Sequence, residues 1–487
     1  MRVSERLRGL RPTEPAHWVL AGMVAAGVLV RCFAAVSWWP AGTTLPDSIL
    51  YASYAEDNPL DSAQHPAGYS AALALLGVVS REVAVPVLLQ HLSGIASALL
   101  LYAAVRRLTG SPWPALAPAA VVLLNADLVF LEHTVMSESL FLLVLSAALY
   151  AAVRSIDAPE PSWRWALACG ALVALAAVIR SAGLFALPVV VLAVLLCRPG
   201  PWRSNWRPPA AIAGAAAVLL LGYATASSAV NGRFELAPAQ GWHLYGRVAP
   251  FADCARFEPP EDTESLCEST PPEKRPGLDY YIFDGTAPAF REFGALGEQD
   301  GKLGSFARAA ILNQPGDYLS AVWDDISGFY VPGGYPFRRG AGSDLDPQLD
   351  WRWPLLPVAV EVPTTEREIE LGMEGFFNPF SVDPDPGGLE QLRDYQTVFR
   401  FGATALAITT ALSLLGLLIG PRRNRVAVLL FGVGGLAILL LPALSVQYAA
   451  RYMVPVAPLL AAGAAISVLS AWRRGDGGRR RLGTIAP

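Results

Sequence analysis

The sequence has 487 residues, of which 53% are hydrophobic and only 16% are charged. Soluble domains carry about a quarter charged residues, so this composition excludes an ordinary soluble enzyme. The formal net charge of −4 gives no reason to expect a nucleic-acid partner. Apolar runs of nearly twenty residues recur towards both ends of the chain, and they predict an all-α polytopic membrane protein.

The first apolar run, at about 18–39, follows the basic start MRVSERLRGLR. A basic start before an apolar run is also typical of a secretory signal, but this run is long enough to span a bilayer and no clear cleavage site follows it. We therefore predict an uncleaved first helix. Nine further spans are predicted at about 84–105, 112–130, 135–153, 164–180, 182–197, 209–230, 398–420, 426–446 and 452–471.

Arginine clusters indicate which ends of the spans face the cytoplasm. With ten spans every cluster falls on one face, so we predict a multi-pass plasma-membrane protein with both termini in the cytoplasm. The clusters are Arg2, Arg6, Arg8 and Arg11; Arg106 and Arg107; Arg154 and Arg164; Arg198, Arg203 and Arg207; Arg422, Arg423 and Arg425; and Arg473, Arg474 and Arg479 to Arg481.

This topology divides the chain into parts. An N-terminal transmembrane module covers 1–230 and contains a first external loop at 40–83; an extracytoplasmic domain at 231–397, C-terminal spans at 398–472 and a cytoplasmic basic tail at 473–487 follow. The external domain is acidic and rich in Pro and Gly, and we expect it to be mixed α/β or irregular, with a helix at DYLSAVWDDISGFY. The apolar stretch Pro66–Ser80 is too short for a span and is expected to form a helix at the membrane surface.

Cysteine usage agrees with this sidedness. Cys254 and Cys267 lie in the external region, where an oxidising environment favours a disulfide between them; two unrelated thiols are the alternative. Cys32, Cys169 and Cys197 lie in apolar spans, where small packing residues are expected.

Acidic residues gather in the first external loop, in the stretch LPDSILYASYAEDNPLDSAQHPAGYS. Asp47 is the acid nearest to the end of the first span, and a carboxylate there can act as general base on a hydroxyl substrate. Glu56 and Asp57 lie in a polar turn and are interpreted as solvated loop charges.

Three arginines lie at or below the predicted external surface: Arg31, Arg180 and Arg451. A charge at this depth is costly and normally faces the interior of the bundle. A guanidinium is also suited to binding phosphate oxygens, and a lipid phosphate lies at headgroup level. Snorkelling and interhelical salt bridges are the alternatives for each of them.

Four motifs together resemble the C-fold membrane glycosyltransferases, in particular the branch of protein O-mannosyltransferases and lipid A aminoarabinose transferases. That branch carries D-E-x-x-Y and H-P-P-G/L-Y in the first external loop, an acid at the start of the fourth span, R-P-x-G-L and a late R-Y-x-x-P. Here Ser48 replaces the second acid, which weakens a metal-binding pair. The matching residues are Asp47, Tyr51, His65, Pro66, Gly68 and Tyr69, then Glu138, Arg180 and Gly183, and finally Arg451, Tyr452 and Pro455.

The resemblance implies a membrane-embedded transferase that takes a sugar from a polyprenyl-phosphate donor and inverts the anomeric centre. Asp47 would activate the acceptor hydroxyl, on a protein, lipid or cell-envelope glycan, and Arg180, Arg451 and Arg31 would bind the donor phosphate. No cofactor or metal ion is expected. The residues implied in the substrate pocket are Tyr51, His65, Tyr69, Glu132, Glu138 and Tyr452.

Alternatives remain open at this point. Tyr51 and Tyr69 are also compatible with an interfacial aromatic belt, and His65 with a structural role beside Pro66. A multi-span transporter or lipid flippase fits the spans and the arginines, although the two halves show no symmetry of hydropathy. A membrane-anchored scaffold would leave the acids of the first loop unexplained. The identity of the sugar is not indicated.

Overall fold

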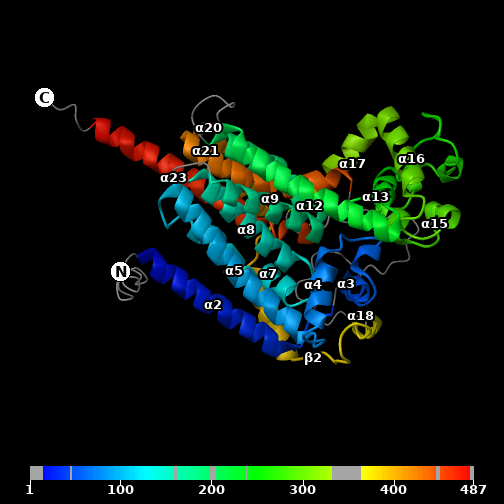
Figure 1. The fold of residues 1–487 in the computed structure, drawn as a ribbon, viewed down its shortest axis with the longest axis horizontal. Helices are drawn as coiled ribbons and strands as arrows, with labels where there is room; N and C mark the ends of the chain where they lie inside the picture. Colours follow the sequence, from blue (N-terminus) through cyan, green and yellow to red (C-terminus); the bar gives the residue numbers. More distant parts are fainter. Residues whose placement is uncertain are drawn as a thin grey trace.

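The computed structural model describes residues 15–43, 47–157, 162–197, 205–236, 239–331, 363–445 and 450–482. Within these ranges the chain is almost entirely helical (Figure 1). One short antiparallel strand pair is present there, between β1 (Trp38–Trp39) and β2 (Asp383–Pro384). The described residues leave out the predicted basic clusters at Arg2 to Arg11 and at Arg198 and Arg203.

A bundle of apolar helices forms the body of the molecule, as predicted. Its N-terminal part contains α2 (Pro15–Ser37), α5 (Ala84–Thr109), α6 (Leu116–Leu124), α7 (Ala126–Glu132), α8 (Glu138–Ile156), α9 (Trp163–Ile179), η2 (Ser181–Phe185), α10 (Ala186–Leu196) and α12 (Arg207–Asn231). Its C-terminal part contains α20 (Ala403–Ile419), α21 (Arg422–Val428), the π-helical turn η5 (Leu429–Val433), α22 (Gly434–Leu440), η6 (Leu441–Leu444), η7 (Ala450–Met453) and α23 (Ala457–Leu482).

The helices of this bundle are apolar on their outer as well as their inner faces. Leu29, Val218 and Leu418 expose 69%, 70% and 73% of their surface, which is stable only against lipid. Six helical segments of the described chain are long and apolar enough to cross a membrane. Each of the ten predicted ranges coincides with a helix or a run of helices, so the polytopic helical fold is confirmed, whereas the number of spans stays a prediction.

The third predicted range is interrupted at Asn125, between α6 and α7. The Asn125 side chain accepts a hydrogen bond from the backbone N–H of Asp127 and caps α7. Asp127 is itself buried and bonds to Gln396 and Arg400. This break directs α7 across the end of the bundle, so that Glu132 at its end lies inside the protein.

The first loop is more ordered than the sequence indicated, because it begins with a helix. Asp47 starts α3 (Asp47–Glu56), which is followed by η1 (Pro59–Asp61) and α4 (Gly68–Gly77). The short helix predicted within Pro66–Ser80 is confirmed as α4, and its interfacial position stays a prediction. Leu75 on α4 and Val78 just beyond it expose 73% and 84% of their surface.

The range 231–397 contains two parts that pack differently. The first has its own core, formed by Trp242, Tyr245, Tyr281 and Phe306, and is described as the outer unit below. It comprises α13 (Gln240–Val248), η3 (Glu264–Leu266), η4 (Pro272–Lys274), α14 (Leu278–Phe283), α15 (Pro288–Phe293), α16 (Asp300–Asn313) and α17 (Pro315–Gly328). The helix predicted at DYLSAVWDDISGFY is confirmed as α17.

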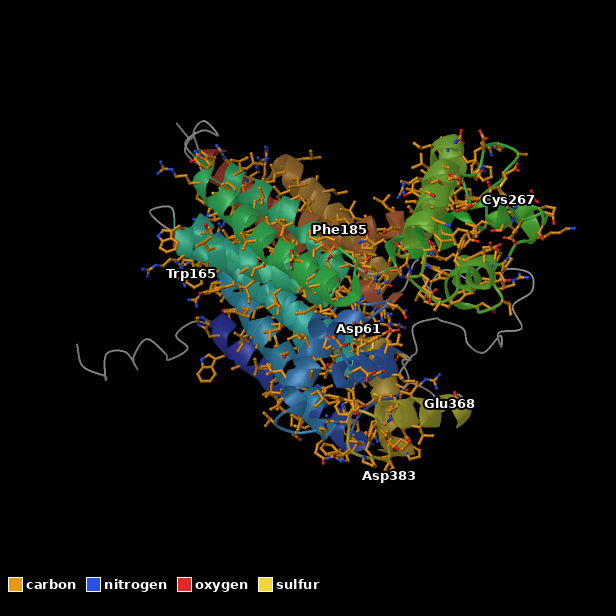
Figure 2. The ribbon with its side chains drawn as sticks, turned by 45° about the vertical axis from the view of Figure 1, so that its right-hand side comes forward. Asp61, Trp165, Phe185, Cys267, Glu368 and Asp383 are labelled. Atoms are coloured by element: carbon orange, nitrogen blue, oxygen red, sulfur yellow. A yellow bond between two sulfur atoms is a disulfide. The ribbon has the colours of Figure 1, made fainter. Side chains whose placement is uncertain are left out.

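The second part, α18 (Pro363–Met373) and α19 (Pro386–Val398), joins the core of the bundle through Met373 and Leu392. Figure 2 shows the separation: Cys267 lies in the outer unit, whereas Glu368 and Asp383 lie at another corner of the molecule. The described residues of 231–397 are helical with irregular connections; the first part packs around its own core and the second part on the core of the bundle.

Candidate functional site

Asp47 lies at the start of α3, where a carboxylate also interacts favourably with the helix dipole. Its Oδ2 atom accepts a hydrogen bond of 2.5 Å from Nη2 of Arg451, which belongs to η7 before the last helix. The Nε2 atom of His65 lies 3.8 Å from the same oxygen. The structure therefore brings the predicted base together with one predicted phosphate-binding arginine and with His65 of the first loop.

Three aromatic rings hold this loop in place. The rings of Tyr51 and His65 are stacked at 4.8 Å, and Tyr69 meets Tyr51 edge-on at 4.7 Å. Tyr51 and Tyr69 expose only 2% and 3% of their surface. The two tyrosines are therefore part of the protein interior beside Asp47, and an interfacial aromatic belt does not describe them.

Arg180 lies at the break between α9 and η2 and points at the start of α8. Its Nη1 atom is 2.7 Å from Oε1 of Glu138 and donates to Oγ of Ser137 at 2.9 Å. Ser137 also bonds to the Tyr51 hydroxyl at 3.0 Å, so it links Arg180 to the first loop. Sequence reasoning missed Ser137, although it directly precedes Glu138 in the motif MSES.

Tyr452 lies between the two arginines. The Arg180 guanidinium is 5.5 Å and that of Arg451 5.8 Å from the centre of its ring. Cation–π attraction is significant within about 6 Å, so one ring supports two cations. A buried carboxylate, Glu138, and a second one, Asp47, offset their charge. Two guanidinium groups thus lie near one aromatic ring, and each of them is paired with a carboxylate.

The electrostatics of the site favour an ionised Asp47. Burial acts to raise its pKa, but the charge of Arg451, together with the nearby His65, outweighs burial and holds the pKa well below the ordinary value. Burial raises the pKa of Tyr51 and of Tyr69 above the usual range, so both phenols stay protonated and can donate hydrogen bonds. The site therefore contains an ionised carboxylate beside neutral hydroxyl donors and cationic guanidinium groups.

Arg31 and Glu132, which the sequence also suggested for the phosphate site and the substrate pocket, bond to each other, and within the described residues no hydrogen bond or ion pair joins either side chain to this group. Arg31 is 3% exposed and uses Nε and Nη2 to bind both carboxylate oxygens of Glu132 at 2.7 Å. Its remaining hydrogen bonds go to backbone carbonyls of Gly27, Val122 and Leu123. These contacts use the donors of Arg31 inside the bundle, which agrees with the interhelical salt bridge named above as the alternative for this residue.

The carboxylate of Glu132 continues into a buried chain of hydrogen bonds that sequence reasoning missed. Oε2 of Glu132 is 3.1 Å from Nδ1 of His91, whose Nε2 is 3.1 Å from Nδ1 of His133. Nε2 of His133 lies 2.6 Å from the carbonyl oxygen of Trp38, so His133 donates there. The neighbouring polar pair Gln90 and His91 inside an apolar span was the sequence signal that could have revealed this chain.

Gln90 joins the buried chain to the site. Its Nε2 donates to the backbone carbonyls of Glu132 and Thr134, and its Oε1 accepts a 2.6 Å hydrogen bond from the Tyr69 hydroxyl. Helix α5 is therefore bonded to α7 and to the first loop at the same point. This arrangement fixes Tyr69 and, through the ring contact, Tyr51.

The outer unit approaches the site through His243 of α13. Burial and the charge of nearby His65 lower the pKa of His243 to about 4, so the ring is neutral at physiological pH. Its Nδ1 atom is buried without a hydrogen-bond partner among the described residues. Sequence reasoning did not select His243, because nothing in the chain order relates it to His65.

Cys254 and Cys267 lie within bonding distance in the outer unit, as the predicted disulfide requires. Within the part of the chain that the structure describes, no three His, Cys, Asp or Glu side chains are grouped as a metal ion would require. The predicted packing role of Cys169 agrees with its burial in α9, whereas Cys32 is exposed on α2.

Comparison with known proteins shows which family a part of this chain resembles. A comparison with curated proteins gives no match. The crystal structure of ArnT from Cupriavidus metallidurans bound to undecaprenyl phosphate aligns over 95% of this chain and 79% of that one, with 14% sequence identity and a TM-score of 0.36. Residues 64–226 match the family described as dolichyl-phosphate-mannose-protein mannosyltransferase. Over these residues, which include His65, Tyr69, Glu138 and Arg180, the resemblance to the membrane glycosyltransferases is confirmed.

Proposed function

We propose that this protein is an integral membrane glycosyltransferase that moves a sugar from a polyprenyl-phosphate donor to a hydroxyl acceptor. The observation that carries the proposal is the meeting of Asp47 with Arg451, and the approach of both Arg451 and Arg180 to the ring of Tyr452. The three polar residues come from the first loop, the end of α9 and η7 before the last helix. Their convergence is what a base and a phosphate site in one reaction require.

In the proposed reaction Asp47 accepts the proton of the acceptor hydroxyl while its oxygen attacks the anomeric carbon. The bond between that carbon and the phosphate oxygen breaks, and its electron pair stays on the polyprenyl phosphate. A single displacement of this kind inverts the anomeric centre. The proton on Asp47 then passes to water, which returns the carboxylate to its starting state.

Arg180 and Arg451 are the proposed ligands of the donor phosphate. A guanidinium can bind two phosphate oxygens at once, and its positive charge stabilises the leaving phosphate as negative charge develops on it. Arg451 already bonds to Asp47. If the guanidinium turned some of its N–H groups to the phosphate, its contact with Asp47 would weaken. The basicity of Asp47 would rise as a result, at the moment when a base is needed.

Glu138, Tyr51 and His65 are proposed to position the sugar or the acceptor. No hydrogen bond reaches either carboxylate oxygen of Glu138 from the described residues, so both can accept from a hydroxyl in addition to the ion pair with Arg180. Nε2 of His65 is likewise buried without a hydrogen bond there. We keep both as substrate contacts and assign Tyr69 a positioning role, since its hydroxyl is used by Gln90.

The proposed sidedness follows from the arginine clusters. The termini are placed in the cytoplasm, and the site of Asp47, the outer unit and α18 are placed on the extracytoplasmic side of the plasma membrane. Residues 1–230 then form the main catalytic module, 398–472 contribute Arg451, and 473–487 form a cytoplasmic tail. The acceptor is proposed to be a hydroxyl of the cell envelope, on glycan, lipid or protein.

The test is an assay of purified protein with radiolabelled polyprenyl-phosphate sugars, scored for transfer and for slow hydrolysis of the donor. A glycosyltransferase cleaves the sugar–phosphate bond, and the Asp47→Asn variant loses this activity while it still binds donor. Movement of label across vesicles without bond cleavage would identify a transporter instead. Normal turnover by Asp47→Asn would remove Asp47 as the base.

A further inference from the structure

Helix α17 of the outer unit exposes large apolar side chains that no described part of the chain covers. Leu319 and Trp323 expose 61% and 67% of their surface. They are four residues apart, so they lie on the same face of the helix. Gly316 and Ser320 are exposed beside them. We call Gly316, Leu319, Ser320 and Trp323 the α17 face.

The α17 face is free of charge, although the helix carries three aspartates. Asp317 is 2.7 Å from Arg256, and Asp325 pairs with Arg247 on the side that faces the protein. Asp324 follows Trp323 directly and therefore points about 100° away from it around the helix. The acidic residues are thus kept off the face that carries Leu319 and Trp323.

Two hydrogen bonds, one of them from α17, tie the outer unit to the end of a predicted span. The Tyr318 hydroxyl donates to the carbonyl oxygen of Leu444 at 2.7 Å, and Arg247 of α13 donates to that of Ala443 at 2.9 Å. Both carbonyls belong to η6, which ends a segment long and apolar enough to cross a membrane. Figure 1 shows α17 beside this orange segment, at the end of the bundle where the outer unit lies.

The chain directly after α17 reaches deeper still. The Tyr330 hydroxyl is 3.3 Å from Oγ1 of Thr410, and Phe329 is 4% exposed in the core that the spans share. Thr410 lies seven residues inside α20, which is about 10 Å along a helix axis. Trp323 precedes Tyr330 by seven residues and lies in the helix that leads directly to this contact with α20.

We propose that the α17 face lies in the headgroup layer of the bilayer and anchors the outer unit to the lipid surface. Trp is favoured at this depth, and an amphipathic helix with an uncharged apolar face binds there. The helix α20, which Tyr330 contacts, also exposes apolar side chains, among them Ile408 at 55%. The bilayer is therefore the proposed occupant, and a second copy of the chain is the alternative that the experiment must exclude.

The experiment uses the full-length protein in phosphatidylcholine vesicles and compares its fluorescence with that of Trp323→Phe. The signal of Trp323 is the difference between the two spectra. We expect brominated phosphatidylcholine to quench this difference signal and aqueous iodide to leave it largely unchanged. Quenching by iodide without quenching by bromolipid would place Trp323 in water and overturn the proposal. Resistance to both quenchers would mean that protein covers it, which overturns the proposal in favour of a second copy.

A second measurement does not depend on the tryptophan. A nitroxide attached to Leu319→Cys should collide often with oxygen and rarely with a water-soluble nickel complex. The matched control is Glu273→Cys, an exposed position of the outer unit in η4, at which the nickel complex should collide freely. The unsubstituted protein, labelled in the same way, supplies the background from its own cysteines. Equal nickel accessibility at positions 319 and 273 would contradict membrane anchoring.

Discussion

Arg451 donates a hydrogen bond of 2.5 Å to Asp47, although 404 residues separate them in the chain. The contact joins the first loop to η7, just before the last helix. It also sets the chemistry of the carboxylate, because the charge of Arg451 helps to keep Asp47 ionised in spite of its burial. The first two predictions concern this pair.

Replacing Asp47 by Asn should abolish transfer while leaving the site assembled. Asn keeps the size of the side chain and can still bond to Arg451, but it accepts no proton. General base catalysis contributes about 10²–10⁴-fold, so transfer should fall by at least that range. Donor binding, measured with radiolabelled polyprenyl-phosphate sugar, should persist. Asp57→Asn is the matched control, since Asp57 is exposed just after α3 and its loss should leave transfer unchanged.

Replacing Arg451 by Gln should move the acid limb of the pH–rate profile upward. In the wild-type protein Asp47 stays ionised far below neutral pH, so transfer should not fall through its titration between pH 5 and 8. Without Arg451 burial is no longer offset, the pKa of Asp47 rises, and the base is lost as pH falls. Arg256→Gln, which breaks an exposed ion pair in the outer unit, should keep the wild-type profile. A profile for Arg451→Gln with no shift would show that Arg451 does not control Asp47.

Breaking the buried pair of Arg31 and Glu132 should destabilise the bundle. Removing one partner of such a pair leaves an uncompensated charge and costs about 3–5 kcal/mol. Thermal unfolding in detergent should show this loss for Arg31→Met, and Arg31→Met combined with Glu132→Leu should recover part of it. Donor affinity of the folded fraction should be unchanged. A loss of donor affinity as large as that of Arg451→Lys would restore Arg31 as a phosphate ligand.

The cysteine pair of the outer unit should be oxidised in exported protein. A free-thiol count on the unfolded, unreduced chain should find Cys32, Cys169 and Cys197 and no others. Because a disulfide that closes a loop of this size contributes about 3 kcal/mol, Cys254→Ser should unfold the outer unit at a lower temperature. Reaction of Cys254 and Cys267 in the same count would end this prediction.

Lowering the pH should reduce the stability of the folded protein, in part through protonation of His243. Its pKa is lowered to about 4 in the folded protein, against an ordinary value of 6.5. As the pH falls, the unfolded chain therefore binds a proton on His243 before the folded protein does. The contribution of neutral His243 to stability is fully present above about pH 6.5 and is lost between about pH 6.5 and 4. His243→Gln should flatten the pH dependence of the unfolding temperature within the window. The groups that face His243 are His65, Asp300 and Phe283. These three residues should therefore be the same in the wild-type protein and in the His243→Gln variant.

Much of the fold could be read from the sequence because lipid imposes a simple rule on composition. Long apolar runs must form helices in a membrane, and all ten predicted ranges are helical. The short helix α4 could be located from the length of its apolar stretch, and the helix α17 from the run DYLSAVWDDISGFY. The internal division of 231–397 could not, because whether α19 packs on α2 or on the outer unit depends on contacts between distant segments.

The sequence alone determined the membrane-spanning class, the residue types at the site and their order along the chain. Which of those residues meet was decided only by the tertiary structure. Arg31 and Arg451 are both arginines near the predicted outer surface, but one is used by Glu132 inside the bundle and the other by Asp47. Side chains from segments hundreds of residues apart become neighbours only through helix packing, and no local pattern of the chain records which carboxylate each arginine will reach.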